Sequence, residues 1–297
     1  MSSPDSVFQG VWIPLVTPFS HGAVDGAALR RLVRHLRVAG VDGLVVCGST
    51  GEAAALDDAE QLAVLDAVLG EADGLPVAMG LAGNHQGHAL RRLAAFGTRP
   101  LAGILAPAPY YVRPGQEGAA AYFRALADRA PFPLMLYDIP YRTGAELALD
   151  TLLALAAHPN IAAIKDCGGS LDKSAALIAD GRLRVLAGED LQAFALRCLG
   201  ASGMIAAAAH IRPDLFVALD RAVRAQQLER ARTLFHGLAP LIRLAFAEPN
   251  PGPVKALLAQ QGLMRAELRA PMPAASAALA ARMAAAAAEL DGRFPPP

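Results

Sequence analysis

The chain has 297 residues, of which 54% are hydrophobic, and its formal net charge at pH 7 is zero. This composition can bury one large core, and the balanced charge excludes the strongly basic surface that binds nucleic acid. The cysteines Cys47, Cys167 and Cys198 have no metal-binding spacing, so we expect reduced thiols in a cytoplasmic protein.

Neither end of the sequence predicts a targeting or membrane segment. The first residues lack a positive region ahead of their apolar stretch, which a secretory signal peptide would have. The alanine-rich stretch 274–290 is interrupted by Arg282, so it favours a helix over a membrane span.

Short apolar segments alternate with helical stretches along about the first 225 residues. The predicted strands are residues 11–18, 43–46, 76–80, 103–105, 134–137, 161–165, 184–187 and 204–206. The helices predicted to follow them are residues 27–39, 57–69, 85–96, 116–129, 150–157, 171–180, 191–199 and 213–225. Eight such repeats predict an α/β fold, a (β/α)8 TIM barrel. An open doubly wound sheet is the alternative, but the first strand lacks the glycine-rich turn that such folds use for phosphate.

Three more helices are predicted at residues 227–246, 253–261 and 274–290. No linker separates them from the preceding repeats. We therefore expect residues 1–297 to form a single domain, with the barrel at about 10–225 and a C-terminal helical extension at about 226–297 packed on it.

Polar residues gather where the predicted strands end, which is where catalytic groups of TIM barrels lie. These residues are Ser49 and Thr50 after the second strand, Tyr110 and Tyr111 after the fourth, Tyr137 and Arg142 at the fifth, Lys165 at the sixth, and Gly188, Glu189 and Asp190 after the seventh.

Lys165 is the predicted reactive residue. The 27 basic residues include only three lysines, Lys165, Lys173 and Lys255, so a retained lysine hints that an amine is needed. A lysine at the end of an apolar strand has a lowered pKa, which frees its amine to attack a carbonyl. The non-catalytic alternative is a lysine whose side chain extends from the strand end to solvent.

Tyr137, Ser49 and Tyr111 are the hydroxyls that could relay protons, and Arg142 could bind a carboxylate through two hydrogen bonds. The sequence contains no metal-binding or nucleotide-binding motif such as HExxH, Walker A or GxGxxG. We expect no cofactor and no metal, as suits a lysine that forms its own covalent bond.

With these motifs, residues 10–272 resemble the dihydrodipicolinate synthase/N-acetylneuraminate lyase family of class I aldolases. The resemblance is carried by Gly48-Ser49-Thr50-Gly51-Glu52, Pro109-Tyr110-Tyr111, Tyr137-Asp138-Ile139-Pro140, Arg142-Thr143-Gly144 and Ile164-Lys165-Asp166.

The resemblance implies that Lys165 forms a Schiff base with pyruvate and that Tyr137 handles protons. It implies that Ser49 links Tyr137 to Tyr111, which in this family reaches in from a neighbouring subunit. A homotetramer or homodimer is therefore implied.

The resemblance also implies that Thr50 holds the pyruvate carboxylate, while Gly188 and Ile205 line the pocket with backbone groups. The chain is most similar to the synthase branch, because Arg142 matches an arginine that binds the carboxylate of aspartate semialdehyde. The C-terminal segment from Glu248 to Lys255 also matches that branch, which implies a structural role for Lys255. The implied reaction condenses pyruvate with aspartate semialdehyde in lysine biosynthesis.

The chain departs from the common synthase pattern at several positions. Tyr141 is bulky where many synthases have a small residue, Val112 replaces an asparagine, and Asp166-Cys167 replaces Glu-Ala. These departures leave the aldehyde partner open. His88 stands where lysine-sensitive enzymes have a glutamate, so we expect weak or no inhibition by lysine.

Two alternatives remain. One is a pyruvate-dependent aldolase or dehydratase that acts on a sugar acid or hydroxy-oxo acid through the same imine. The other is a non-catalytic barrel that binds a metabolite, which predicts loss of Lys165, Tyr137, Ser49 or Tyr111, and all four are present.

Overall fold

The fold is seen in a computed structural model that describes residues 7–296. The strands are β1 (Gly10–Pro14), β2 (Phe19–Ser20), β3 (Ala23–Val24), β4 (Gly43–Val46), β5 (Val77–Gly80), β6 (Gly103–Pro107), β7 (Leu134–Asp138), β8 (Ile161–Asp166), β9 (Arg184–Ala187) and β10 (Gly203–Ile205). The α-helices are α1 (Gly26–Val38), α2 (Asp58–Ala72), α3 (Gln86–Ala95), α4 (Gln116–Ala127), α5 (Pro140–Thr143), α6 (Leu149–Leu155), α7 (Leu171–Asp180), α8 (Ala193–Cys198), α9 (Pro213–Arg224), α10 (Leu228–Ala245), α11 (Gly252–Gln260) and α12 (Ala277–Arg293). Two short 3-10 helices are η2 (Ala53–Ala55) and η3 (Ala208–His210).

Eight strands form a closed barrel in the order β1-β10-β9-β8-β7-β6-β5-β4, while β2 and β3 form a separate antiparallel pair. The predicted TIM barrel with C-terminal helices is confirmed. Contacts along the chain group into two compact units. The first unit comprises the described residues up to Trp12 together with Pro76–Ile205, and the second comprises Ile13–Leu75 and the chain from Ala206 onward. The single domain stays a prediction.

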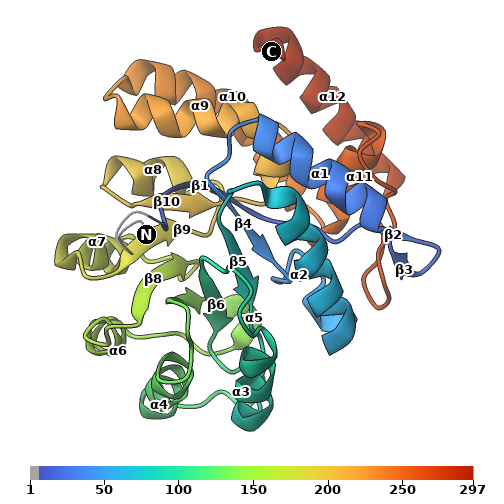
Figure 1. Ribbon diagram of the computed structural model, residues 1–297. Coiled ribbons are helices and arrows are strands. Elements are labelled where there is room, and N and C mark those ends of the chain that lie inside the picture. The colour runs from blue at the N-terminus through green and yellow to red at the C-terminus, as the bar shows by residue number, and fades with distance from the viewer. Residues whose placement is uncertain (1–6, 297) are drawn as a thin grey trace. The chain divides into compact units, whose positions relative to one another are not determined.

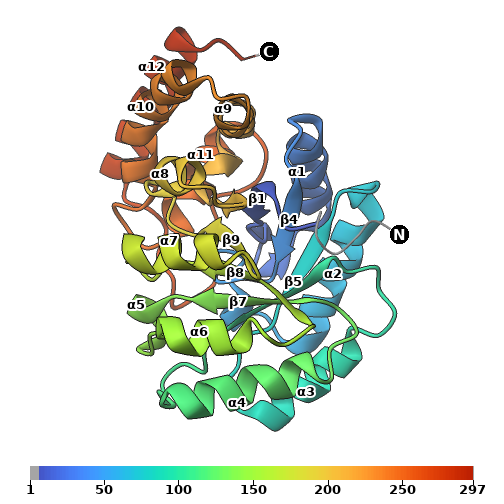
Figure 2. The ribbon, with the colours of Figure 1, turned by 90° about the vertical axis from the view of Figure 1, so that its left-hand side faces the viewer.

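The first unit contains the consecutive parallel strands β5 to β10. All residues of β7 and all but one of β8 are buried, which matches the continuous apolar character of strands covered on both faces. Helices α3, α4, α6, α7 and α8 contact one another in that order around these strands (Figures 1 and 2).

The second unit contains α1, α2 and the C-terminal helices α9 to α12, drawn in orange to red in Figure 1. The predicted apolar stripe of the first helix, Leu29, Leu32, Val33 and Leu36, is buried in α1. Asp25 caps the N-terminus of this helix by accepting two backbone N–H groups. Helix α10 contacts α9, α11 and α12, so the C-terminal helices pack on one another.

The start of the barrel differs from the sequence-based expectation. Strand β1 ends at Pro14 instead of continuing to Pro18, and the short pair β2–β3 follows it. Two-residue strands and the four-residue helix α5 have too little sequence periodicity to be predicted.

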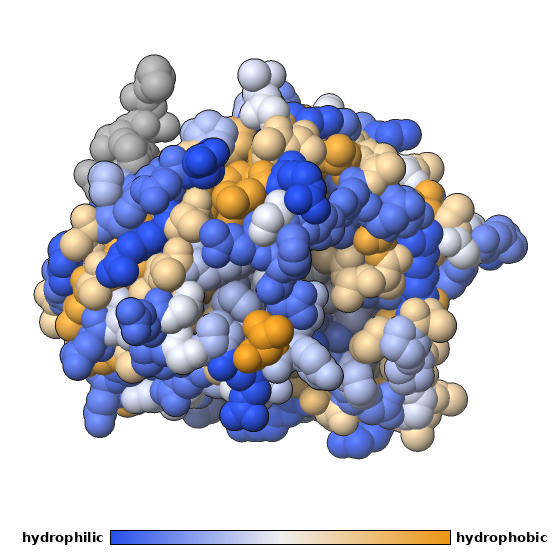
Figure 3. Space-filling model, turned by 90° about the horizontal axis from the view of Figure 1, so that it is seen from below, coloured by the Kyte–Doolittle hydropathy of each residue, from blue (hydrophilic) through white to orange (hydrophobic). Residues whose placement is uncertain are grey.

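In the described part of the chain, no helix is long and apolar enough to cross a membrane. On the face shown in Figure 3, hydrophobic areas are small and bordered by hydrophilic ones. The exposed large hydrophobic side chains include Val38, Tyr111 and Tyr141.

His210 is a fully buried histidine in the second unit. Its Nε2 accepts a hydrogen bond from the Val16 amide at 3.2 Å, and its Nδ1 lies 2.8 Å from the Ala207 carbonyl oxygen. These partners fix a neutral ring that donates from Nδ1. Burial lowers the pKa of His210 to about 4, although the Ala207 carbonyl offsets part of this effect.

We therefore expect the free energy of unfolding to fall as the pH drops from about 6.5 to about 4. The unfolded histidine binds a proton in this window and the folded one does not, so stability is full above the unfolded pKa. The loss is about 3 kcal/mol and is measured by chemical denaturation along a pH series. A His210→Asn variant should lose this slope, whereas His236→Asn, at an exposed histidine, should keep it. Equal pH slopes for wild type and His210→Asn would contradict the assignment.

Candidate active site

The strand register of the first unit places Tyr137 and Lys165 side by side. Lys165, near the end of β8, pairs with Tyr137 of β7 on one side and with Leu186 of β9 on the other. The Lys165 Nζ atom lies 4.4 Å from the centroid of the Tyr137 ring. Both side chains are buried, with exposures of 5% and 6%. Rigid strands thus hold the amine and the phenol next to each other.

The environment of Lys165 favours a neutral amine. Burial lowers the pKa of Lys165, and the nearby Cys167, Asp190 and Glu189 offset part of this effect. In the described chain, Lys165 forms no salt bridge with a carboxylate. Because the protein interior solvates an ammonium poorly, the neutral fraction of this amine exceeds that of a surface lysine. The assignment of Lys165 as the nucleophile stays a prediction.

Gly188 leaves the space that the Lys165 side chain occupies. A Cβ atom at this position would lie 2.3 Å from the Cys167 Sγ and 3.0 Å from the Lys165 Cε. The Gly188 amide donates a hydrogen bond of 2.8 Å to the Asp166 carbonyl oxygen, which fixes the chain just after β9. Any larger residue would displace the lysine or the thiol, so the glycine is required for close packing.

Two predicted site residues of the first unit, Arg142 and Tyr111, are exposed. Arg142 lies in α5, and its guanidinium carbon is 5.9 Å from the centroid of the Tyr141 ring. Tyr111 is 87% exposed and has a φ angle of 68°, a left-handed conformation that is unusual for a tyrosine. The loop after β6 therefore presents this ring outward at a cost in backbone strain. Ile205, in contrast, is buried at the end of β10.

Ser49 and Thr50 belong to the second unit. Ser49 is exposed, whereas Thr50 is buried and its hydroxyl oxygen accepts a 2.9 Å hydrogen bond from Asn250 Nδ2. Because Asn250 is the donor, the hydrogen of the Thr50 hydroxyl can point to another acceptor. The proton relay from Ser49 to Tyr137 stays a prediction.

The Ser49 loop is tied to the C-terminal part of the second unit by a buried ion pair. Glu52, the last residue of the Gly-Ser-Thr-Gly-Glu motif, contacts the Lys255 ammonium through its Oε1 atom. Lys255 also donates a 2.9 Å hydrogen bond to the Glu267 carbonyl oxygen. These contacts give Lys255 the structural role that the sequence implied.

A model of the Dihydrodipicolinate synthetase family matches residues 7–289 of the chain. The chain belongs to this family. Its members are class I aldolase-type lyases.

Among its relatives, a 4-hydroxy-tetrahydrodipicolinate synthase of Trichlorobacter lovleyi is 38% identical over 282 residues, which cover 94% of this chain and 97% of the relative. The structure of a chloride-inhibited dihydrodipicolinate synthase from Acinetobacter baumannii complexed with pyruvate is 32% identical, with a TM-score of 0.92. It covers 95% of this chain and 98% of its own. A dihydrodipicolinate synthase from Cyanidioschyzon merolae with lysine bound is 30% identical, with a TM-score of 0.92 and coverage of 96% and 99%. The family resemblance inferred from the motifs is confirmed.

This family member also has contacts at the site that the sequence did not predict. Glu189 accepts a 3.1 Å hydrogen bond from the Tyr141 hydroxyl, and it contributes to the raised pKa of the nearby Cys167 thiol. Glu189 lies two residues after β9, where the sequence analysis expected site residues. Tyr141 and Cys167, however, follow other strands. Only the folded chain brings these three side chains together.

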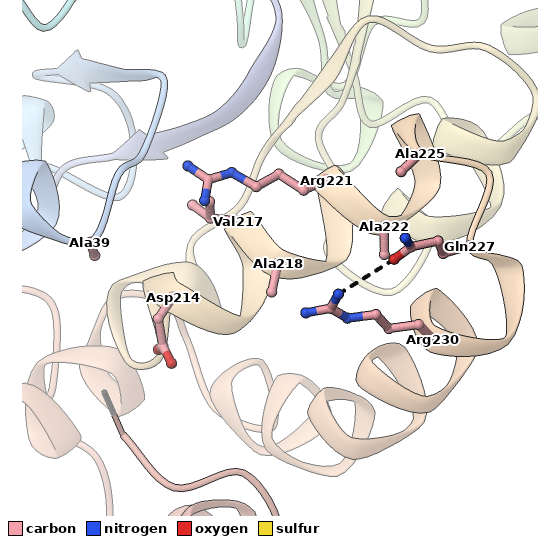
Figure 4. Close-up of a pocket in the computed structure, with 9 residues that line it drawn as sticks. All are labelled: Ala39, Asp214, Val217, Ala218, Arg221, Ala222, Ala225, Gln227 and Arg230. Atoms are coloured by element: carbon pink, nitrogen blue, oxygen red, sulfur yellow. Dashed lines mark hydrogen bonds between the residues drawn. The ribbon is translucent and has the colours of Figure 1, made fainter.

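The described residues include no group of three or more His, Cys, Asp or Glu side chains placed to hold a metal ion. The second unit has a separate hollow of about 370 Å³ beside α9 and the start of α10 (Figure 4). Alanine and valine line it together with Arg221, Arg230, Asp214 and Gln227, and Arg230 donates a 3.4 Å hydrogen bond to Gln227. It contains no amine nucleophile or hydroxyl, so the family's chemistry does not belong there.

A buried ion pair supports the ends of β7 and β8. Asp138 follows Tyr137 and is fully buried, and its Oδ2 accepts a 2.8 Å hydrogen bond from the Lys173 ammonium. Burial raises the pKa of Asp138, and Lys173 offsets part of this rise. Gly168 is required here, because its Cβ would lie 2.7 Å from Asp138 Oδ2 and 2.8 Å from Lys173 Nζ.

We expect Lys173→Met to lower the free energy of unfolding by about 3–5 kcal/mol, because it leaves the Asp138 carboxylate buried without its cationic partner. The double variant Lys173→Met/Asp138→Asn should recover part of this loss. Glu146→Gln is the matched control, since Glu146 pairs with Lys173 from an exposed position and should change stability by about 1 kcal/mol or less. Chemical denaturation measures all three, and a small loss for Lys173→Met would contradict the role of the pair.

Proposed function

We propose that the chain is a cytoplasmic Schiff-base lyase that condenses pyruvate with aspartate semialdehyde to 4-hydroxy-tetrahydrodipicolinate in lysine biosynthesis. The observation that carries this proposal is the buried Lys165 amine, unpaired with any carboxylate in the described chain and 4.4 Å from the Tyr137 ring centroid. The similarity of the whole chain to synthases supports the choice of reaction.

In the proposed reaction, the neutral Lys165 nitrogen attacks the keto carbon of pyruvate, and loss of water gives an iminium. A proton leaves the methyl carbon to form an enamine, and this carbon attacks the aldehyde. The amino group of the added semialdehyde then closes the ring on the former keto carbon and releases the Lys165 amine. Tyr137 is the residue that moves protons at the imine and at the aldehyde oxygen, with Ser49 and Tyr111 as the relay.

Substrate binding is assigned to groups around this amine. Thr50 donates its hydroxyl hydrogen to the pyruvate carboxylate, a role supported by Asn250 being the donor to its oxygen. Backbone groups of Gly188 and Ile205 line the site. Arg142 binds the carboxylate of the aldehyde, because a guanidinium matches a carboxylate with two parallel hydrogen bonds. No metal or cofactor takes part in this proposal.

The active enzyme is proposed to be a homotetramer or a homodimer. The outward and strained position of Tyr111 supports this, because such a ring is placed to enter the site of a second subunit. An exposed Tyr110 precedes it and Val112 follows it, which makes the whole segment suitable for an interface.

The second candidate function is an aldolase or dehydratase that uses the same pyruvate imine with a sugar acid or hydroxy-oxo acid. The bulky Tyr141, at a position where many synthases have a small residue, is the observation that keeps it open. Arg142 favours the synthase, because it suits a short substrate that ends in a carboxylate. A comparison of aspartate semialdehyde with a panel of sugar acids, each assayed for turnover, decides between the two.

We expect borohydride reduction in the presence of pyruvate to leave a stable adduct on Lys165, detected by intact mass and peptide mapping. Lys165→Arg should keep the fold and the charge but lose the adduct, with turnover reduced at least about 1000-fold. Arg142→Lys is the matched variant: it should keep the pyruvate adduct and raise the KM for aspartate semialdehyde. Near-normal turnover of Lys165→Arg, or no adduct in the wild type, would refute the imine.

We also expect weak or no inhibition by lysine in a steady-state assay. His88 is exposed in the first turn of α3. Its imidazole stands where lysine-sensitive enzymes have a glutamate, whose carboxylate would pair with the ammonium group of the inhibitor lysine. His88→Glu should increase sensitivity to lysine, with wild type as its control. Strong inhibition of the wild type at sub-millimolar lysine would refute this expectation.

A further inference from the structure

Three neighbouring segments of the first unit meet beside the end of β8. Tyr141 lies in α5 after β7, Cys167 follows β8 directly, and Glu189 lies two residues after β9. The final residues of β7, β8 and β9 are aligned in register, so the three segments leave the sheet at the same level. Side chains from the two flanking segments can therefore reach across the strand that carries Lys165.

Glu189 joins the two flanking segments by a hydrogen bond. Its Oε1 atom accepts from the Tyr141 hydroxyl at 3.1 Å. Partial burial, Cys167 and Glu189 raise the pKa of Tyr141. The phenol therefore keeps the proton that it donates. We call the pair Tyr141 and Glu189 the β7–β9 bridge.

The β7–β9 bridge lies close to the reactive amine. Gly188, the neighbour of Glu189, packs so closely on Lys165 and Cys167 that a Cβ would overlap both. Charges on Glu189 and Arg142 both influence the pKa of Lys165. A carbonyl compound bound to Lys165 must extend past these groups.

The Tyr141 ring is the outer part of the bridge. It is 65% exposed, and the Arg142 guanidinium lies 5.9 Å from its centroid. A substrate carboxylate that binds Arg142 is thus placed beside the ring, and atoms further out meet the ring itself. Glu189 thus holds in place the ring that stands beside Arg142.

We propose that Tyr141, held by Glu189, is a specificity-determining residue that restricts the carbonyl partners of Lys165 to short ones. The inference rests on the proposed function and deepens it by naming the substrate class. Accepted aldehydes are short and end in a carboxylate that Arg142 binds. Long polyhydroxylated aldehydes are excluded because they collide with the phenol ring.

The first test measures access to Lys165 without any assumption about the reaction. Purified full-length protein is treated with borohydride and either glyoxylate, a small aldehyde, or pyridoxal 5′-phosphate, a bulky one. Because the sequence has only three lysines, peptide mapping assigns each adduct. Tyr141→Ala should raise the ratio of bulky to small adduct on Lys165 at least about tenfold, the usual effect of opening a fitted pocket.

Two variants examine the hydrogen bond. Tyr141→Phe keeps the ring but loses the bond to Glu189, and Glu189→Gln weakens the acceptor; each should raise the ratio by a smaller factor, about two- to fivefold. Phe246→Ala, which removes another exposed aromatic side chain outside the bridge, should leave the ratio unchanged. A wild-type ratio in Tyr141→Ala overturns the proposal, and a wild-type ratio in both other variants overturns the role of Glu189.

The second test compares kcat/KM for aspartate semialdehyde and for sugar aldehydes of four to six carbons, with pyruvate consumption as the readout. Tyr141→Ala should shift this preference toward the sugars at least about tenfold. An unchanged preference in a variant that still forms the pyruvate adduct overturns the proposal alone. If the wild type accepts only sugars, both the synthase assignment and the length restriction are overturned. The ratio of bulky to small adduct on Lys165 in the first test shows separately whether Tyr141 limits access.

Discussion

The structure depends on how the chain offsets the large desolvation free energy of a buried lysine ammonium. All three lysines are buried, with exposures of 5% for Lys165, 7% for Lys173 and 0% for Lys255. Two of them have a buried carboxylate partner: Asp138 for Lys173 and Glu52 for Lys255. The attraction within each pair offsets much of the desolvation cost, and the pairing fixes both side chains. Lys165 has the Tyr137 ring as its neighbour instead.

This difference separates two uses of the same residue type. Paired lysines connect distant segments: Lys173 connects α7 to the end of β7, and Lys255 connects α11 to the loop that contains Thr50. A lysine without a carboxylate partner can lose its proton and react. Arginine would suit none of these positions, because its planar guanidinium is larger and stays protonated. The rarity of lysine in an arginine-rich chain therefore has a structural basis at every position where lysine remains.

The sequence predicted the repeating elements well because parallel strands and amphipathic helices have strong periodic patterns. The expected helix at 171–180 and strand at 184–187 coincide with α7 and β9. Lysine scarcity pointed to Lys173 as much as to Lys165, and only the partners in the fold distinguish their roles. The hydrogen bond between Tyr141 and Glu189 joins residues 48 positions apart on different loops. No local pattern specifies such a contact, because it depends on which strands are neighbours in the barrel.

The departures from the common synthase pattern now have a physical relation to one another. Tyr141 donates a hydrogen bond to Glu189, and Glu189 also contributes to the raised pKa of Cys167. A small residue at 141 would leave that carboxylate without its phenol donor. Both departures are therefore neighbours of Glu189. In the proposed mechanism, imine formation depends on the register of β7, β8 and β9, whereas the proposed limit on the length of the partner aldehyde depends on Tyr141 and Glu189. The two properties can thus change independently within one barrel.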